Sequence, residues 1–451
     1  MIGASLSRWT LSYFAVALLA LLTAQGLMAA GYGYPVAPIE APQTLVLVHL
    51  VAIGWLSLLM CGALFQFVPV LVARPLFSNS LPLPTLICLV GGLAALIAGF
   101  LQLDGWIEPW LSVFPLAGVL LGLGFALMLW NLGRTLWAAR PLSLPARFVV
   151  VGLFSLAATA ALGIIFALVL GGVATQPVLS VLTAAAVPVH AVAGLGGWLT
   201  FSAMGVSYRL LSMFMLAPDL DRAITRSSFY VGTAALVVAV AGGTAAACHD
   251  GNVALVLTLA GVLGLAALTL YGADILHIYR ARKRRRIELN SRMAMLALIS
   301  LALAVAMMVA ALALGALRQH LGAIVFLLAF GWLSGLGLAK LYKIVPFLTW
   351  LECYGPVLGK KPTPRVQDLV TEPRAVKWFA LYFLAVWTGA VALIAGRAPL
   401  FRIAAAAMLI ATCGIVLQLI RARRLADVAA AARLPEGARQ PWLLVAHSKH
   451  T

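Results

Sequence analysis

Charged residues are scarce in this chain, and acidic residues are the scarcest of them. Asp, Glu, Lys and Arg together make up 10% of the 451 residues, and only 13 residues are acidic. A water-soluble globular protein carries about 25% charged residues. Hydrophobic residues account for 63% of the sequence. This balance excludes a water-soluble enzyme, a disordered chain, a coiled coil and a nucleic-acid-binding domain. It predicts a polytopic membrane protein whose main surroundings are a lipid bilayer.

Motifs of soluble enzymes and paired cysteines are missing as well. The five cysteines show no Cys-x-x-Cys spacing, and the sequence contains no P-loop, no Gly-x-Ser-x-Gly and no zinc-binding spacing.

Twelve apolar runs are each long enough to cross a membrane, which takes about 20 residues as a helix. Backbone groups in lipid must be hydrogen-bonded within the segment, so we expect an all-α protein. The runs cover 9–31, 44–73, 83–103, 111–137, 147–173, 181–214, 229–247, 253–279, 293–316, 321–348, 377–395 and 399–421.

The positive charges alternate along the chain and predict an orientation. The net charge is +18, and Lys and Arg gather in the connections that follow even-numbered runs, most densely in residues 280–286. Loops rich in Lys and Arg stay in the cytoplasm. We therefore expect an inner-membrane protein with both termini in the cytoplasm and with 9–31 as a retained first span. Residues 422–451 are expected to form a basic cytoplasmic tail that begins with an interfacial helix.

A threefold repeat runs through the twelve segments. Gly54-Trp-Leu-Ser57, Gly197-Trp-Leu-Thr200 and Gly331-Trp-Leu-Ser334 begin three segments that align without gaps. They fall on the second, sixth and tenth runs, which divides the chain into units of about 1–137, 147–279 and 293–421 within one domain, 1–421. The pattern predicts three four-helix arcs related by a pseudo-threefold axis, with the second, sixth and tenth helices inside and the Trp side chains packed in the bundle.

This plan resembles subunit I of the heme-copper oxidases. In that family the second helix carries a heme-ligating His about twenty residues before an aromatic-rich run ending in Pro, and His49 precedes Phe65-Gln-Phe-Val-Pro69 by that interval. The family's sixth helix carries a copper-ligating His near its periplasmic start, where Pro188-Val-His190 stands, and residues 341–350 are similar to the end of its tenth helix. Heme- and copper-associated proteins of the NnrS type, linked to nitric oxide stress, are also similar in build.

The departures from the oxidases fall on their metal ligands. Phe326 and Ile324 occupy the positions of the two His of the tenth helix, and residues 229–247 contain no His pair. Gly194 stands where the family has a Tyr four residues after the copper-binding His. The oxygen-reducing site of the family therefore cannot be assembled from these residues.

His49 and His190 remain as the candidate site residues. A His inside a membrane is costly unless it has a partner, and neutral imidazole binds both heme iron and copper. One interpretation makes one or both the ligands of a b-type heme, with copper as an alternative metal. The other makes each a core His bonded to a backbone carbonyl or a nearby Ser or Thr.

Three functions follow from these interpretations. The first is a heme-binding relative of the oxidases without oxygen-reductase activity, acting as an accessory or electron-transfer component of respiratory or nitric-oxide-related metabolism with a redox partner protein. The second is a transporter of a small molecule or metal. The third is a structural subunit without a cofactor.

Overall fold

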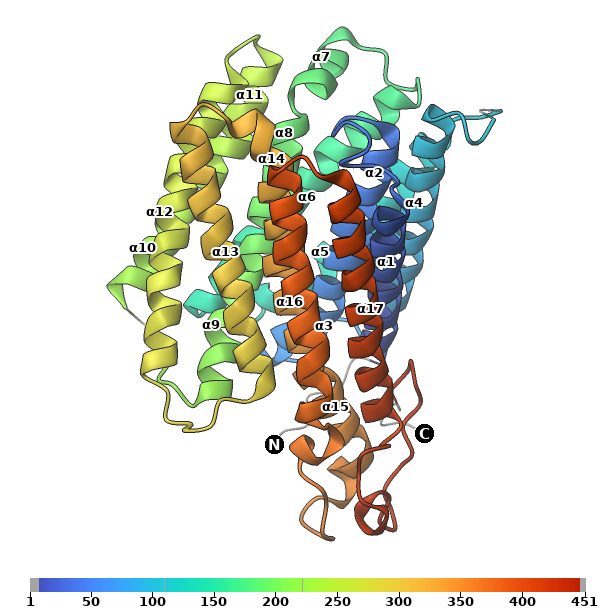
Figure 1. Cartoon of the computed structure of the whole chain (residues 1–451), viewed down its shortest axis with the longest axis vertical. Helices are drawn as coiled ribbons and strands as arrows, with labels where there is room; N and C mark the ends of the chain where they lie inside the picture. The colour runs from blue at the N-terminus through green and yellow to red at the C-terminus, as the bar shows by residue number, and fades with distance from the viewer. Residues whose placement is uncertain (1–7, 109, 221, 447–451) are drawn as a thin grey trace. The chain divides into compact units, whose positions relative to one another are not determined.

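The computed structural model describes residues 8–108, 110–220 and 222–446 (Figure 1). Within these ranges the regular structure is helical, and twelve helical segments are long and apolar enough to cross a membrane. The expected all-α fold with twelve spans is therefore confirmed, and the chain is a multi-pass membrane protein. Both ends of the chain, residues 1–7 and 447–451, lie outside the described residues.

Four of the spans are composed of several helical pieces, and the other eight are single helices. The single helices are α1 (Thr10–Ala30), α4 (Pro82–Leu103), α5 (Phe114–Trp137), α6 (Leu144–Leu170), α12 (Val253–Arg280), α13 (Leu289–Ala313), α16 (Glu372–Ile394) and α17 (Ala398–Arg423). The composite spans are α2 (Pro42–His49), η1 (Leu50–Ser57) and α3 (Leu58–Leu71); α8 (Val187–Ala191), η2 (Val192–Phe201) and α9 (Ser202–Met215); α10 (Ala223–Val237), η3 (Val238–Gly242) and α11 (Gly243–Cys248); and α14 (Leu317–Phe326), η4 (Leu327–Ser334), α15 (Gly335–Tyr354) and η5 (Gly355–Val357).

Two spans differ from their expected bounds. The sixth was expected to begin at residue 181, but the chain breaks at Ala186, between α7 (Pro177–Ala185) and α8. Pro188 accounts for the break, because proline is favoured in the first turn of a helix and removes a backbone hydrogen bond when it lies in the interior. The tenth span runs over 41 residues, Leu317–Val357. At about 1.5 Å per residue it is roughly 60 Å long, about twice the thickness of the hydrocarbon core.

The chain divides into two compact units. The first takes in the described residues up to Gly62 and those from Ile287 onward, and the second takes in residues 63–286. In the first unit α1 packs against η1 and α17, α13 packs against η4 and α15, and α16 packs against α17. In the second unit α4 packs against α5, α5 against α6, α6 against η2 and α9, and α10 against α12.

These pairings repeat along the sequence. In each predicted repeat the first helix packs against the π-helical part of the second, as α1 does with η1, α6 with η2 and α13 with η4. The third helix of each repeat packs against the fourth, as α4 does with α5, α10 with α12 and α16 with α17. The internal packing of the three repeats is thus similar, and their arrangement as three arcs about one axis stays a prediction.

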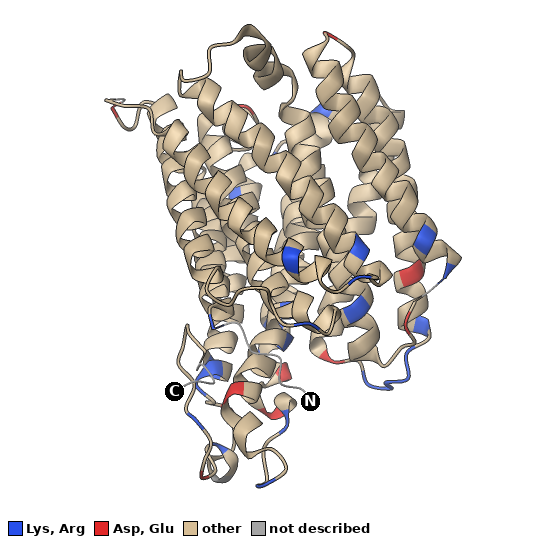
Figure 2. Ribbon diagram, turned by 180° about the vertical axis from the view of Figure 1, so that it is seen from behind, with Lys and Arg blue, Asp and Glu red and all other residues tan. Residues whose placement is uncertain are grey.

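Charges lie mainly at the ends of the helices within each unit (Figure 2). Arg209 of α9 pairs with Asp219 at 3.0 Å, and Lys343 of α15 pairs with Glu288 at 2.7 Å. Both carboxylates belong to segments that connect two spans. The Arg209–Asp219 pair is exposed to water, whereas Lys343 and Glu288 are mostly buried and compensate each other's charge.

The segment after α17 does not form the expected interfacial helix. Beyond Arg423 the described chain contains only the short 3-10 turn η7 (Ala430–Ala432) and then runs without regular structure. Leu425 and Val428 are instead buried in a small core with Cys353, Tyr354, Val357 and Leu369. Figure 1 shows this segment beside the projecting end of α15. The apolar side chains are therefore covered by the chain's own helix, not by lipid.

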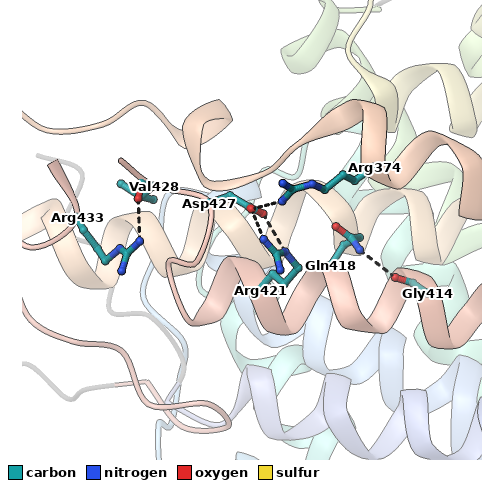
Figure 3. Close-up of polar contacts among 7 residues, drawn as sticks. All are labelled: Arg374, Gly414, Gln418, Arg421, Asp427, Val428 and Arg433. Carbon is teal, nitrogen blue, oxygen red and sulfur yellow. Dashed lines mark hydrogen bonds and ion pairs between the residues drawn. The ribbon is translucent and has the colours of Figure 1, made fainter. Parts of the chain in front are cut away.

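Asp427 links the ends of two helices in this segment (Figure 3). Its carboxylate accepts hydrogen bonds from Arg374, at 2.7 Å, and from Arg421. Arg374 lies at the start of α16 and Arg421 in the last turn of α17. The hydrogen bond from Arg421 is the main cause that holds the pKa of Asp427 below its ordinary value, with Arg374 adding to it.

The depressed pKa of Asp427 predicts a loss of stability in acid. A carboxylate with a lowered pKa in the folded state stabilises the fold above its unfolded pKa, about 3.9, and this contribution disappears as the pH falls through the folded pKa. We expect the midpoint of thermal unfolding to fall less between pH 5 and pH 3 for Asp427→Asn than for the wild type. Parallel pH profiles, separated by a constant offset, would contradict this expectation.

Candidate functional site

Each Gly-Trp-Leu-Ser/Thr segment lies in a π-helical stretch. The first stretch is Leu50–Ser57, the second Val192–Phe201 and the third Leu327–Ser334. π-helical turns are rare and are frequently found at functional sites; a further one, η3, lies outside the motif. The same motif thus adopts the same rare backbone form in three spans.

The hydroxyl at the fourth position of the motif bonds to the widened turn. Thr200 Oγ1 donates to the Leu195 carbonyl at 2.7 Å, and Ser334 Oγ donates to the Ala329 carbonyl at 2.6 Å. Both partners are five residues back, whereas Ser207 in the α-helical part of the sixth span bonds four residues back. Ser or Thr fits this position because its hydroxyl can donate a hydrogen bond to the backbone carbonyl five residues back in the π-helical turn.

The motif tryptophans are completely buried, as expected from the sequence. Trp55, Trp198 and Trp332 are each at most 1% exposed. In the first unit the Trp55 indole Nε1 donates to Ser334 Oγ at 2.7 Å, which joins the first and third repeats of the motif. Trp and Ser thus satisfy each other in an apolar interior, where an unpaired polar group is costly.

Two of the three motif glycines, Gly197 and Gly331, allow close contact with a serine on the first helix of the same repeat. A Cβ added at Gly197 would lie 2.4 Å from the Ser155 Cβ, and one added at Gly331 would lie 2.7 Å from the Ser300 Cβ. Small residues at such crossings let two membrane helices approach closely. The position of the glycine in the motif is therefore set by packing.

His49 is the last residue of α2 and directly precedes the π-helical stretch η1. Its Nδ1 lies 2.8 Å from the Leu45 carbonyl oxygen, and its side chain is half-buried. A carbonyl only accepts hydrogen bonds, so Nδ1 carries the proton and Nε2 is the basic nitrogen of the neutral ring. The bond to Leu45 thus fixes the orientation of the imidazole ring.

His190 lies closer to the end of its span than expected. Because the sixth span begins at Val187, His190 is in its first turn. Its Nδ1 donates to the Thr159 carbonyl of α6 at 3.1 Å, and its ring lies 5.5 Å from that of Phe166. His190 is therefore held against α6, and like His49 it bonds through Nδ1 to a backbone carbonyl.

Phe326 is the counterpart of His49 in the third repeat. It stands five residues before Gly331, as His49 stands five before Gly54, and it directly precedes η4. Its ring packs against Phe330, at 5.0 Å, and Phe401, at 5.4 Å. The position that could hold a second ligand in the first unit is thus part of an aromatic cluster.

Lys340 was not singled out by the sequence motifs, although it is a buried basic residue in α15. Its side chain is 7% exposed. In the repeat frame it stands nine residues after the Gly, where the other two repeats have Ala63 and Val206. A break in an otherwise apolar repeat position was the signal that could have found it. Ionisable residues inside membrane spans are commonly functional.

A second buried charge lies in the other unit. Asp274 of α12 is fully buried, accepts a hydrogen bond from the Tyr208 hydroxyl at 3.2 Å and pairs with Arg222 at 3.5 Å. The Tyr208 hydroxyl and the Arg222 guanidinium thus compensate the charge of Asp274. We therefore interpret this cluster as structural.

Side chains that could hold a metal by themselves do not gather in the described part of the chain. No three His, Cys, Asp or Glu residues lie together there in a group that could bind a metal ion. Comparison with known proteins adds no assignment, because no family model and no curated protein matches the chain.

Proposed function

We propose that the protein is a heme-binding membrane protein of the heme-copper-oxidase-like type that lacks the oxygen-reducing site. His49 would supply the axial nitrogen to a b-type heme. The protein would act as an accessory or electron-transfer component in respiratory or nitric-oxide-related metabolism, together with a redox partner protein.

The observation that carries this proposal is the setting of His49. Its ring is half-buried within a membrane span, its Nδ1 is engaged by the Leu45 carbonyl, and it stands at the boundary between α2 and η1. Histidines that bind metals usually donate their other ring nitrogen to a carbonyl or carboxylate, which fixes the tautomer and the ring orientation. A π-helical turn beside such a residue is a common functional feature.

The donor set favours heme over a copper ion held by the protein alone. Heme brings four nitrogen ligands of its own and needs one imidazole from the chain, which His49 offers. A copper site needs several protein donors, and no group of three His, Cys, Asp or Glu residues gathers in the described ranges. Bound heme would supply a redox-active iron, while His49 would hold and orient it. His190, packed against α6, is the weaker candidate for either metal.

The proposal also includes an inner-membrane location with both termini in the cytoplasm. It is supported by the basic connections that follow the even-numbered spans, including residues 280–286, because Lys- and Arg-rich loops remain on the cytoplasmic side. Anionic lipid on that side favours the same placement.

The test of the proposed function is an absorption spectrum. Protein purified in detergent from heme-replete cells should show a Soret band, and His49→Ala should lose or shift it while the protein still inserts. His190→Ala should retain at least most of the band. His249→Ala, which changes an exposed His at the end of α11, is the matched control and should leave it unchanged.

Carbon monoxide separates the two roles of the bound iron. A change of the reduced spectrum on adding carbon monoxide indicates an open coordination position suited to small gases, whereas no change indicates two axial ligands and electron transfer. A colourless preparation with identical wild-type and His49→Ala spectra would exclude the heme proposal and leave a transporter or a structural subunit.

A further inference from the structure

The end of α17 and the returning C-terminal segment enclose a cavity lined by arginine. The cavity has a volume of about 340 Å³ and is lined by Arg423, Arg424, Gln440, Pro441 and Leu443. All of these residues belong to the first unit. We propose that it binds the headgroup of an anionic phospholipid, a site that does not depend on the proposed heme function.

The charge of the cavity suits a phosphate group. Arg423 is 4% exposed; its Nη1 donates to Glu352 at 2.8 Å and to Thr349, its Nη2 donates to the Trp442 carbonyl, and its Nε has no partner among the described residues. Arg424 is exposed and no ion pair of this residue is found in the described ranges. Arg423 is thus compensated by Glu352, while Arg424 adds positive charge at the rim.

The acidic residues of the surrounding segment are already paired. Asp427 is bound by Arg374 and Arg421, and Glu436 pairs with Lys361 at 2.6 Å. An incoming anion therefore meets a positive rim, because the nearby carboxylates have their own basic partners. Arginine recognises phosphate well because its planar group offers several donors in a fixed fork.

The position of the segment identifies a lipid as the source of that phosphate. The Ser12 hydroxyl of α1 donates to the Leu444 carbonyl at 2.8 Å, and the Ala446 amide donates to the Arg8 carbonyl at 3.0 Å. Residues 444–446 thus run beside the start of α1 at Thr10, where the first apolar span begins. This is the depth of the membrane interface.

Exposed apolar residues next to the cavity fit the same location. Trp442, Leu443 and Leu444 are 53%, 43% and 48% exposed. Tryptophan is enriched at membrane interfaces, where its ring lies at the level of the headgroups. A lipid with its phosphate at Arg424 and its chains beside Trp442 and Leu444 would cover this surface.

The experiment uses the full-length protein, delipidated in neutral detergent and titrated separately with phosphatidylglycerol, phosphatidylcholine and inorganic phosphate. Native mass spectrometry measures retained lipid, and thermal unfolding measures stabilisation by each probe. Phosphatidylglycerol should bind and stabilise more than phosphatidylcholine, and phosphate alone should not stabilise. Arg424→Ala should weaken phosphatidylglycerol binding about fivefold, as expected for one basic contact near the surface.

Two variants keep the result specific. Arg397→Ala changes an exposed arginine at the opposite end of α17 and should leave phosphatidylglycerol binding unchanged. Trp442→Gln should weaken binding of the lipid. Equal binding of both lipids, or unchanged binding by Arg424→Ala, would overturn the proposal. Equal stabilisation by inorganic phosphate would overturn the lipid assignment and indicate a site for a soluble anion.

Discussion

Glu352→Gln is expected to destabilise the folded protein by about 3–5 kcal/mol, the usual cost of removing one partner of a buried ion pair. Glu352 and Arg423 have side chains that are 2% and 3% exposed, and their charged groups lie 2.8 Å apart. The substitution would leave the Arg423 charge buried with only neutral neighbours such as Thr349 at that nitrogen. The measurement is thermal or denaturant unfolding of the purified protein in detergent.

A matched surface pair provides the control for this substitution. Arg365 and Asp368 form an ion pair whose side chains are 79% and 40% exposed. Exposed pairs contribute about 0–1 kcal/mol, so Asp368→Asn should change stability little. The double variant Glu352→Leu/Arg423→Met should be closer to the wild type than Glu352→Gln, because it removes both buried charges. If Glu352→Gln and Asp368→Asn lowered the free energy of unfolding equally, the buried ion pair would contribute no more to stability than the exposed pair, which would contradict the prediction.

Gly197→Ala is the second substitution with a large expected effect, about 1–3 kcal/mol of destabilisation from overpacking. The new Cβ would lie 2.4 Å from both the Cβ and the Oγ of Ser155, a separation that forces α6 and η2 apart. Gly196→Ala is the matched control in the same π-helical stretch. Its Cβ would contact only Val192, at 3.7 Å, which is an ordinary van der Waals distance.

The cause of this effect can be tested by removing the other side of the contact. Ser155→Gly should restore much of the stability lost in Gly197→Ala, since the two sites share one crossing. Unfolding in detergent should therefore rank the variants with Gly196→Ala highest, the double variant next and Gly197→Ala lowest. A Gly197→Ala protein as stable as Gly196→Ala would show that the helices can move apart at no cost.

The spans could be predicted from the sequence because local hydrophobicity along the chain determines which segments are stable in a lipid bilayer. Twelve apolar runs became twelve candidate spans, and the tryptophans at the middle of three of them are buried. The first and last residues of a span were less predictable where a proline or a tertiary contact, and not hydropathy, determines where the helix begins or ends. Pro188 interrupts the sixth run, and the tenth helix continues past residue 348 because a small core covers its apolar end.

The candidate site was predictable in part. His49 and His190 could be found from the cost of an imidazole in an apolar run, and the sequence pattern favoured His49. In the structure the break at Ala186 brings His190 to the start of its span and against α6, while His49 lies at the boundary of η1. Lys340 was overlooked because a single basic residue near the basic end of a run resembles an interfacial anchor.

What the sequence alone determined is the all-α, twelve-span architecture and the three Gly-Trp-Leu-Ser/Thr segments, since both are written in residue types and spacing. The tertiary structure decided which of these residues meet. The π-helical turns depend on carbonyls five residues back, and the bond from Trp55 to Ser334 joins residues 279 positions apart. The path of the basic tail also depends on tertiary contacts, because Leu425 and Val428 pack against apolar residues of α15 that are distant in the sequence. Local composition selects the helices, whereas contacts between distant segments settle where polar groups and chain ends lie.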